Sequence, residues 1–168
     1  MKPIPFEIIL KYKDNKHFAD KFREYYKDAA MTNSYMSYSN DIFCFAVRLA
    51  NAWRYEKAIK ERFDLTPQSP VWGQFDPSCN VKGYDFKDKA GYAVEAKRFN
   101  TATGLYNAIK AYNDNDITSF YKLRTHNANT IYAMIARADD TDDYFMHAAV
   151  YKVIIDTANH KITKVYPL

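Results

Sequence analysis

VKGYDFKDKAGYAVEAKRF, residues 81–99, is the stretch that decides the fold. Its alternation of apolar and polar side chains predicts two strands joined by a tight loop. In the second strand Val94 and Ala96 point to one face and Glu95 and Lys97 to the other, because successive strand residues alternate in direction. The sequence therefore predicts a hairpin with one apolar face and one face on which a carboxylate lies beside an ammonium group.

The length of the loop, which we place at Asp88–Gly91, decides where Asp85 points. With a two-residue connection, Asp85 lies opposite Tyr92 and points away from Glu95. With a three-residue connection, Asp85 lies opposite Ala93, and Glu95 is its diagonal neighbour on the same face, about 7–8 Å away between backbones. Two carboxylates at that spacing can hold one hard divalent cation, for which Mg²⁺ is a better candidate than zinc.

The rest of the chain predicts a mixed sheet flanked by helices, an α/β or α+β fold. We expect one domain over residues 1–168, with its core at about 41–137. Asp14 or Asn15 is the expected N-cap of the first helix, and Ser39 or Asn40 that of the longest one. We expect helices at about 16–29, 41–63 and 103–112, and strands at about 5–12, 71–75, 130–137, 146–156 and 162–166.

Glu56 stands out on the longest predicted helix because it falls on an apolar stripe. Burial of a carboxylate is costly unless a cation compensates it, so Glu56 is a candidate third acidic group at the site. The alternative is an ion pair with Lys60 one helical turn away. The stripe, as the sequence predicts it, consists of Ile42, Phe45, Leu49, Ala52, Glu56, Ile59 and Phe63.

Composition excludes several classes of protein. The 168 residues are 48% hydrophobic and 26% charged, which is typical of a globular chain and not of a disordered one. The four glycines have no spacing that forms a glycine-rich phosphate loop. The two cysteines fit neither a disulfide scaffold nor a zinc site, so we expect reduced thiols in a cytoplasmic protein. We expect no membrane span. The net charge of +4 permits a nucleic-acid partner, and the 15 tyrosines reflect either an AT-rich coding genome or base stacking.

The run GYDF…GYAVEAK resembles the signature of the PD-(D/E)xK nucleases, the restriction-endonuclease-like superfamily. The resemblance implies that Asp85 and Glu95 are metal ligands and that the Ala96 carbonyl adds a ligand. It also implies that Lys97 is the catalytic lysine and that Glu56 is the helical acid of the site. The predicted helix, hairpin, helix and strand over 41–137 are similar in order to the αβββαβ core of that family.

Two departures from the family pattern are visible. Tyr84 stands where the signature has proline, and the helix after Lys97 lacks the Gln-x-x-x-Tyr pattern of the RecB-like branch. The resemblance therefore favours a small Mg²⁺-dependent (or Mn²⁺-dependent) DNA endonuclease of the type II restriction or phage and mobile-element kind, working as a homodimer.

Basic side chains around the hairpin and beyond it are the candidate DNA contacts. The alternative is a catalytically inactive module on the same fold that binds nucleic acid or protein, such as a phage-encoded inhibitor, and an RNA-processing nuclease is a third reading. The candidate nucleic-acid contacts are Lys82, Lys87, Lys89, Arg98, Lys122 and Arg124.

Overall fold

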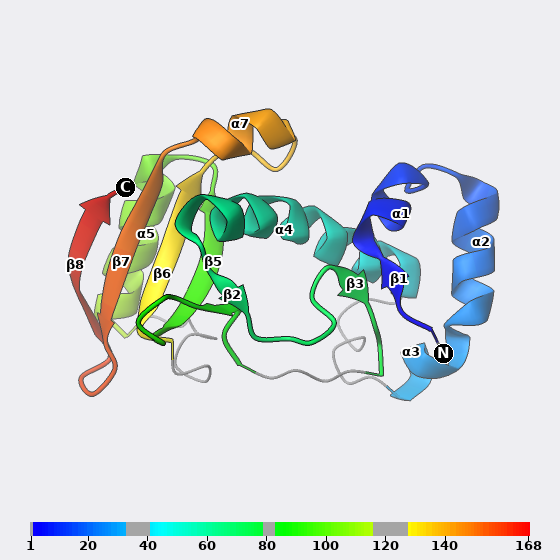
Figure 1. The fold of residues 1–168 in the computed structure, drawn as a ribbon, viewed down its shortest axis with the longest axis horizontal. Helices are drawn as coiled ribbons and strands as arrows, with labels where there is room; N and C mark the ends of the chain where they lie inside the picture. The colour runs from blue at the N-terminus through cyan, green and yellow to red at the C-terminus, as the bar shows by residue number, and fades with distance from the viewer. Residues whose placement is uncertain (1, 33–40, 79–82, 116–127) are drawn as a thin grey trace. The chain divides into compact units, whose positions relative to one another are not determined.

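The computed structural model describes residues 2–32, 41–78, 83–115 and 128–168 (Figure 1). It confirms the mixed α/β class and divides the chain into two compact units. The N-terminal unit comprises residues 1–54 and 70–81, and the sheet unit comprises 55–69 and 82–168. The prediction of one domain over 1–168 stays a prediction.

The sheet unit is built on a mixed sheet, which has six strands in the described part of the chain, in the order β2-β4-β5-β6-β7-β8. Neighbouring strands are antiparallel except β5 and β6, which are parallel. The connection between β5 and β6 contains helix α5, Ala102–Asn113, as a parallel pair requires a long crossover. The strands are β2 Thr66–Pro67, β4 Phe86–Lys87, β5 Ala93–Phe99, β6 Thr130–Ile135, β7 Val150–Asp156 and β8 Lys161–Pro167.

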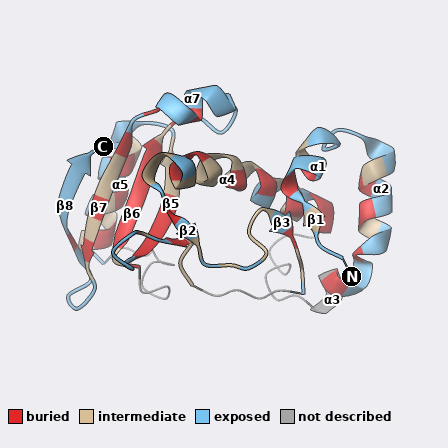
Figure 2. Ribbon diagram, viewed as in Figure 1, coloured by how far each residue is buried: buried red, intermediate tan, exposed pale blue. Residues whose placement is uncertain are grey.

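Helices cover both faces of this sheet. Leu105 and Ala108 of α5 share an apolar core with Ile131 and Ala133 of β6. On the opposite face Tyr132 of β6 meets the ring of Phe63, at the end of helix α4, edge to face with centroids 5.1 Å apart. Figure 2 shows the consequence, because β6 is buried along its length whereas β8 at the sheet edge is mostly exposed.

The N-terminal unit is mainly helical and has an aromatic core. Phe22 lies at its centre, with ring centroids 5.3 Å from Phe43 and 5.4 Å from Phe75. Helix α4, Ile42–Phe63, contributes residues up to 54 to this unit and the remainder to the sheet unit. The other elements are β1 Ile4–Pro5, α1 Phe6–Lys11, α2 Lys16–Tyr25, α3 Lys27–Thr32 and β3 Gln74–Phe75, with β1 antiparallel to β3.

Three predicted strands are wrong in whole or in part. The strand predicted at 71–75 covers only Gln74–Phe75, since 71–73 form a turn, and the helix predicted at 16–29 is interrupted at Tyr26, between α2 and α3. Residues 6–11 of the predicted strand 5–12 form α1, because Phe6 and Ile9 are buried three residues apart while Ile8 between them is exposed. The predicted strand 146–156 begins only at 150, since helix α7, Asp142–His147, takes up its first residues. The Thr141 side chain accepts a hydrogen bond from the Tyr144 amide and caps that helix.

The long helix is confirmed; Ile42 and Ile59 of its predicted apolar stripe are buried, but the other stripe positions are not. Leu49 is 38% exposed, and the buried positions in the N-terminal unit include Ala46, Ala50 and Trp53. Asp41 caps α4 by accepting hydrogen bonds from the amides at 43 and 44. The predicted caps, Ser39 and Asn40, lie outside the described residues. For the first helix, the Asn15 cap is confirmed by its bond to the Phe18 amide.

Candidate active site on strands β4 and β5

The register of the hairpin differs from both predicted registers. Phe86 pairs with Val94, and the chain turns through a five-residue loop from Asp88 to Tyr92. The Asp88 amide donates to the Tyr92 carbonyl at 3.0 Å, and the Tyr92 amide donates to the Asp88 carboxylate at 2.9 Å. The loop is two residues longer than in the three-residue alternative. Because side chains alternate every residue, a shift of two residues leaves Asp85 on the same face as in that alternative.

The observed register brings Asp85 closer to Glu95 than either prediction did. Asp85 is the residue before β4, and continuing the register by one position beyond Phe86 and Val94 sets it opposite Glu95, on the same face. In addition to burial, the negative charge of Glu95 and a side-chain hydrogen bond to it both raise the pKa of Asp85. The second Asp85 oxygen, Oδ2, accepts the Ala96 amide at 2.9 Å. Glu95 is only 5% exposed and Asp85 is half-buried, so the two carboxyl groups meet in a largely buried place.

The electrostatics of this pair are those of a buried acid that keeps its proton. Burial raises the pKa of Asp85 to about 8, and the negative charge of Glu95 adds to the rise. The Ala96 amide and the positive charge of Lys97 lower that pKa in part. At neutral pH the metal-free pair accordingly shares one proton, because two adjacent carboxylates cannot both ionise in a desolvated site without a compensating cation.

The donor set fits a hard divalent cation. A cation replacing the shared proton would be held by the oxygens of Asp85 and Glu95, which are the ligand type that Mg²⁺ prefers. A strand residue directs its amide and its carbonyl to the same neighbouring strand. Since the Ala96 amide points to Asp85, the Ala96 carbonyl oxygen lies on the same side and is available as a third oxygen ligand.

Lys97 lies on the face of the sheet that carries the two acids. It follows Glu95 by two residues on β5, and its charge acts on the Asp85 carboxyl group. Lys87, two residues after Asp85 on β4, is on the same face by the same alternation and is exposed. The hairpin thus places two ammonium groups on one face with the paired carboxyl groups.

Tyr55 on α4 is a site residue that sequence reasoning missed. Burial raises the pKa of its hydroxyl well above the ordinary value, and the negative charges of Glu56, Asp85 and Glu95 raise it further, whereas Arg98 opposes them. The hydroxyl is therefore a neutral group on which the charges of the paired carboxyl groups act. No signal in the sequence could have identified it, because an aromatic residue in an apolar helix is usually a core residue.

Glu56 does not complete a cluster of three acids. It is half-buried on α4 beside Tyr55. Within the described ranges, no group of three or more His, Cys, Asp and Glu side chains is placed to hold a metal ion. The candidate ligand set is therefore Asp85, Glu95 and the Ala96 carbonyl, and a role for Glu56 stays a prediction.

The basic residues predicted to contact DNA differ in the ion pairs and hydrogen bonds that they make within the protein. Lys89 forms an exposed ion pair with Asp64 at 3.0 Å. Arg98 donates to the Asn100 side chain at 2.6 Å and to the Ala136 carbonyl at 2.9 Å, which holds its guanidinium against the end of β6. Of the remaining candidates, Lys87 is exposed on β4. Lys82, Lys122 and Arg124 lie outside the described residues.

Comparisons with protein-family models, with curated proteins and with solved structures found no match. Among the helices that the structure describes, none is both long enough and apolar enough to cross a membrane. Interpretation of the site therefore depends on its own geometry.

Proposed function

We propose that this chain is a Mg²⁺-dependent endonuclease that hydrolyses DNA phosphodiester bonds on a restriction-endonuclease-like core. One observation carries the proposal: the Asp85 carboxylate, which accepts the Ala96 amide at 2.9 Å, lies beside the buried Glu95, and the charges of Glu95 and Lys97 both act on it. A buried acid pair held by a shared proton is costly for stability, and such sites are typical of function. Mn²⁺ is expected to replace Mg²⁺.

The topology of the sheet unit supports the same proposal. After α4 come β2 and then, beyond β3 of the N-terminal unit, β4, β5, α5 and β6; with β3 set aside because it belongs to the other sheet, this is the order αβββαβ that the resemblance implies. The first three strands are antiparallel neighbours, and the last is parallel to β5. In this order Asp85, immediately before β4, lies next to the acid-x-lysine triplet of the adjacent strand β5, as the resemblance implies.

The residues of the site have distinct parts in the proposed hydrolysis. Asp85, Glu95 and the Ala96 carbonyl would hold Mg²⁺, which supplies stabilisation of charge on the phosphoryl oxygens and lowers the pKa of a water molecule. Lys97 contributes a positive charge beside the same carboxylates, where it can neutralise the charge that develops on phosphorus-bound oxygen. The water would lose a proton as its oxygen bonds to phosphorus, one P–O ester bond would break, and the departing oxygen would take up a proton, so that none is gained or lost overall.

The partners follow from the same proposal. Lys87 is exposed on the face that carries the acids, where it can bind a neighbouring phosphate of the substrate. A homodimer would allow both strands of a duplex to be cut, since one chain has one such site among its described residues. The proposed setting is the cytoplasm.

Plasmid cleavage tests the proposal. Purified parent protein, Lys97→Ala and Asp85→Asn are incubated with supercoiled DNA in Mg²⁺ and in EDTA, with Lys164→Ala on the exposed strand β8 as the matched control. We expect the parent and Lys164→Ala to cleave only in Mg²⁺, and the two site variants to be slower by about 100-fold or more.

Two outcomes would contradict the proposal. Equal nicking by all four proteins would identify a contaminating nuclease. DNA binding by the parent without cleavage in Mg²⁺ or Mn²⁺ would favour the inactive binding module instead. An RNA substrate in parallel separates a ribonuclease from a deoxyribonuclease.

A further inference from the structure

A cavity of about 420 Å³ lies in the N-terminal unit, and none of its lining residues is among those assigned above. Residues 2–4 form one wall, and Phe18, Lys21, Phe22 and Tyr25 of α2 form much of the other. This size is within the range of pockets that bind small organic groups. The lining is apolar and aromatic apart from the two lysines, and it contains no acidic residue.

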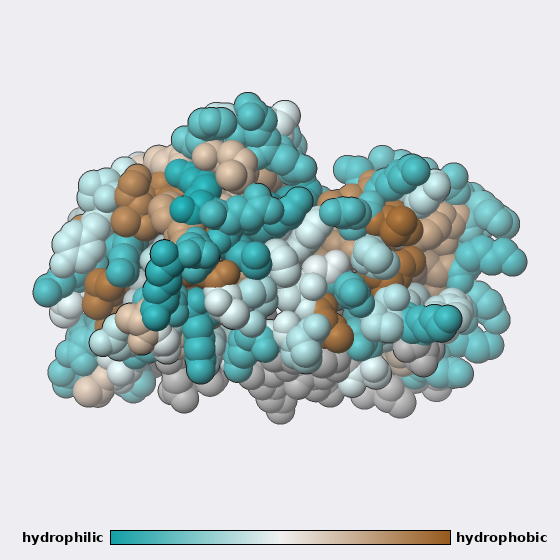
Figure 3. Space-filling view, viewed as in Figure 1, coloured by the Kyte–Doolittle hydropathy of each residue, from teal (hydrophilic) through white to brown (hydrophobic). Residues whose placement is uncertain are grey.

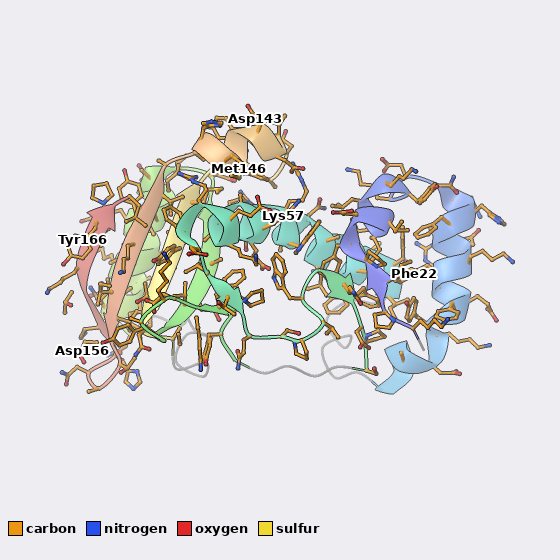
Figure 4. All side chains as sticks on the ribbon, in the orientation of Figure 1. Phe22, Lys57, Asp143, Met146, Asp156 and Tyr166 are labelled. Carbon is orange, nitrogen blue, oxygen red and sulfur yellow. The ribbon has the colours of Figure 1, made fainter. Side chains whose placement is uncertain are left out.

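One face of α2 supplies both the floor and the mouth of the cavity. Phe18, Lys21, Phe22 and Tyr25 follow the spacing of one helical face. Phe22 is buried in the aromatic core and points from α2 into this unit (Figure 4), whereas Tyr25 is 52% exposed. Figure 3 shows hydrophobic surface gathered in this unit near α1 and β1.

Two hydrogen bonds fasten the N-terminal wall to α2. The Lys2 amide donates to the Tyr25 hydroxyl at 3.2 Å, and the Tyr26 hydroxyl donates to the Lys2 carbonyl at 2.9 Å. Burial raises the pKa of Tyr26 to about 12, so its hydroxyl remains a donor. The cavity is therefore held open by specific contacts and is not a gap beside a loose chain end.

The charges around the cavity favour an anion. Most cations of α2 are neutralised within the unit, since Lys16 pairs with Asp20 at 2.6 Å and Arg23 with Asp41 at 2.9 Å. Lys2 and Lys21 line the cavity and are exposed, and neither forms an ion pair with any residue that the structure describes. A ligand with a flat apolar body and a negative group beside it would match both the lining and the two ammonium groups.

We propose that this cavity receives one unpaired base of single-stranded nucleic acid, stacked on Tyr25, with the adjoining phosphates at Lys2 and Lys21. Stacking on an exposed aromatic ring beside a basic rim is the usual way in which proteins bind single strands without reading their sequence. The assignment gives a role to at least one of the many tyrosines noted in the composition. It deepens the proposed function, on which its nucleic-acid partner depends.

Binding of a fluorescent oligothymidylate, followed by anisotropy in EDTA so that no cleavage occurs, tests this assignment. Tyr25→Ala is expected to weaken binding by about 10-fold. Tyr144→Ala, which removes an equally exposed tyrosine from α7 of the other unit, is expected to leave binding unchanged. Tyr25→Phe keeps the ring but loses the bond from the Lys2 amide; because the Tyr26 hydroxyl still holds the Lys2 carbonyl, this variant is expected to keep most of the binding that Tyr25→Ala loses.

Lys21→Glu keeps the assignment testable if Tyr25→Ala does not fold, because Lys21 is an exposed helix residue. It is expected to weaken binding by at least as much as Tyr25→Ala, and more strongly at low salt. Equal binding by Tyr25→Ala, Lys21→Glu and the parent would overturn the assignment. A second result would also overturn the assignment: oligonucleotide binding that no substitution weakens, together with oleate binding that Tyr25→Ala abolishes. That result would assign the cavity to an acyl chain.

These outcomes are separable from failure of the nuclease proposal. Tyr25-dependent binding by a parent protein that cleaves nothing would support the cavity assignment and contradict the nuclease. Plasmid cleavage that depends on Lys97, without Tyr25-dependent binding of single strands, would support the nuclease and overturn the cavity assignment.

Discussion

Replacing Asp85 with Asn is expected to change how the stability of the metal-free protein depends on pH. The carboxyl group of Asp85 has a pKa of about 8 in the folded chain against an ordinary value of 3.8. Between these two values the folded protein binds a proton that the unfolded chain has lost. The free energy of unfolding therefore falls as the pH rises through this window, and the loss is complete above about pH 8.

The size of the effect follows from the shift. One proton bound only in the folded state changes the free energy of unfolding by about 1.4 kcal/mol per pH unit. Between about pH 5 and about pH 8 the parent should lose about 4 kcal/mol at most, a large part of the stability of a small protein. Asparagine can still accept from the Ala96 amide and donate to Glu95, so Asp85→Asn should remove most of this loss.

Urea unfolding in EDTA at several pH values measures the difference. Asp14→Asn, which removes an exposed carboxylate in the turn before α2, is the matched control and should follow the parent. Near pH 8 the Asp85→Asn protein should be more stable than the parent, although it lacks the proposed activity. A parent whose stability is flat or rises between pH 5 and 8, with Asp85→Asn parallel to it, would refute the reasoning.

Two further predictions concern the scaffold of the sheet unit. Arg62→Ala should lower the free energy of unfolding by about 2–3 kcal/mol, because Arg62 donates to the carbonyls of Phe145 and Ala148 at 2.9 and 2.8 Å. Urea unfolding measures this loss of stability. A loss no larger than that caused by Arg137→Ala, at an exposed arginine, would contradict the prediction. Thr101→Ala should cost about 1 kcal/mol and Thr101→Ser much less, because the Thr101 hydroxyl accepts the Gly104 amide at the start of α5; equal thermal stability of all three proteins would contradict the cap.

Alternation along β5 was sufficient to predict that Glu95 and Lys97 share a face, because the period of a strand is fixed by its backbone. The exact partner of Asp85 was not predictable from the same rule. The Asp88 carboxylate closes a longer turn on the Tyr92 amide, and this shifts the register by two residues. A side chain that bonds its own turn is a local event that loop statistics do not reveal.

Tertiary contacts explain the other differences. The segment 6–11 is a short apolar run, which can form a strand or a helix until burial selects one face. The stripe on α4 failed because the helix serves two units: Ala50 and Trp53 are buried in one, and Ala58 and Ile59 belong to the other. Tyr55 joins the site through the same helix, and no spacing along the chain predicts that proximity.

Anomalous X-ray scattering from crystals grown in Mn²⁺ tests the central claim most directly. The account predicts a Mn²⁺ peak between the carboxylates of Asp85 and Glu95, beside the Ala96 carbonyl, in the parent protein and none there in Asp85→Asn. A parent structure in which the two carboxyl groups remain bonded to each other at saturating Mn²⁺, with no metal between them, would contradict it.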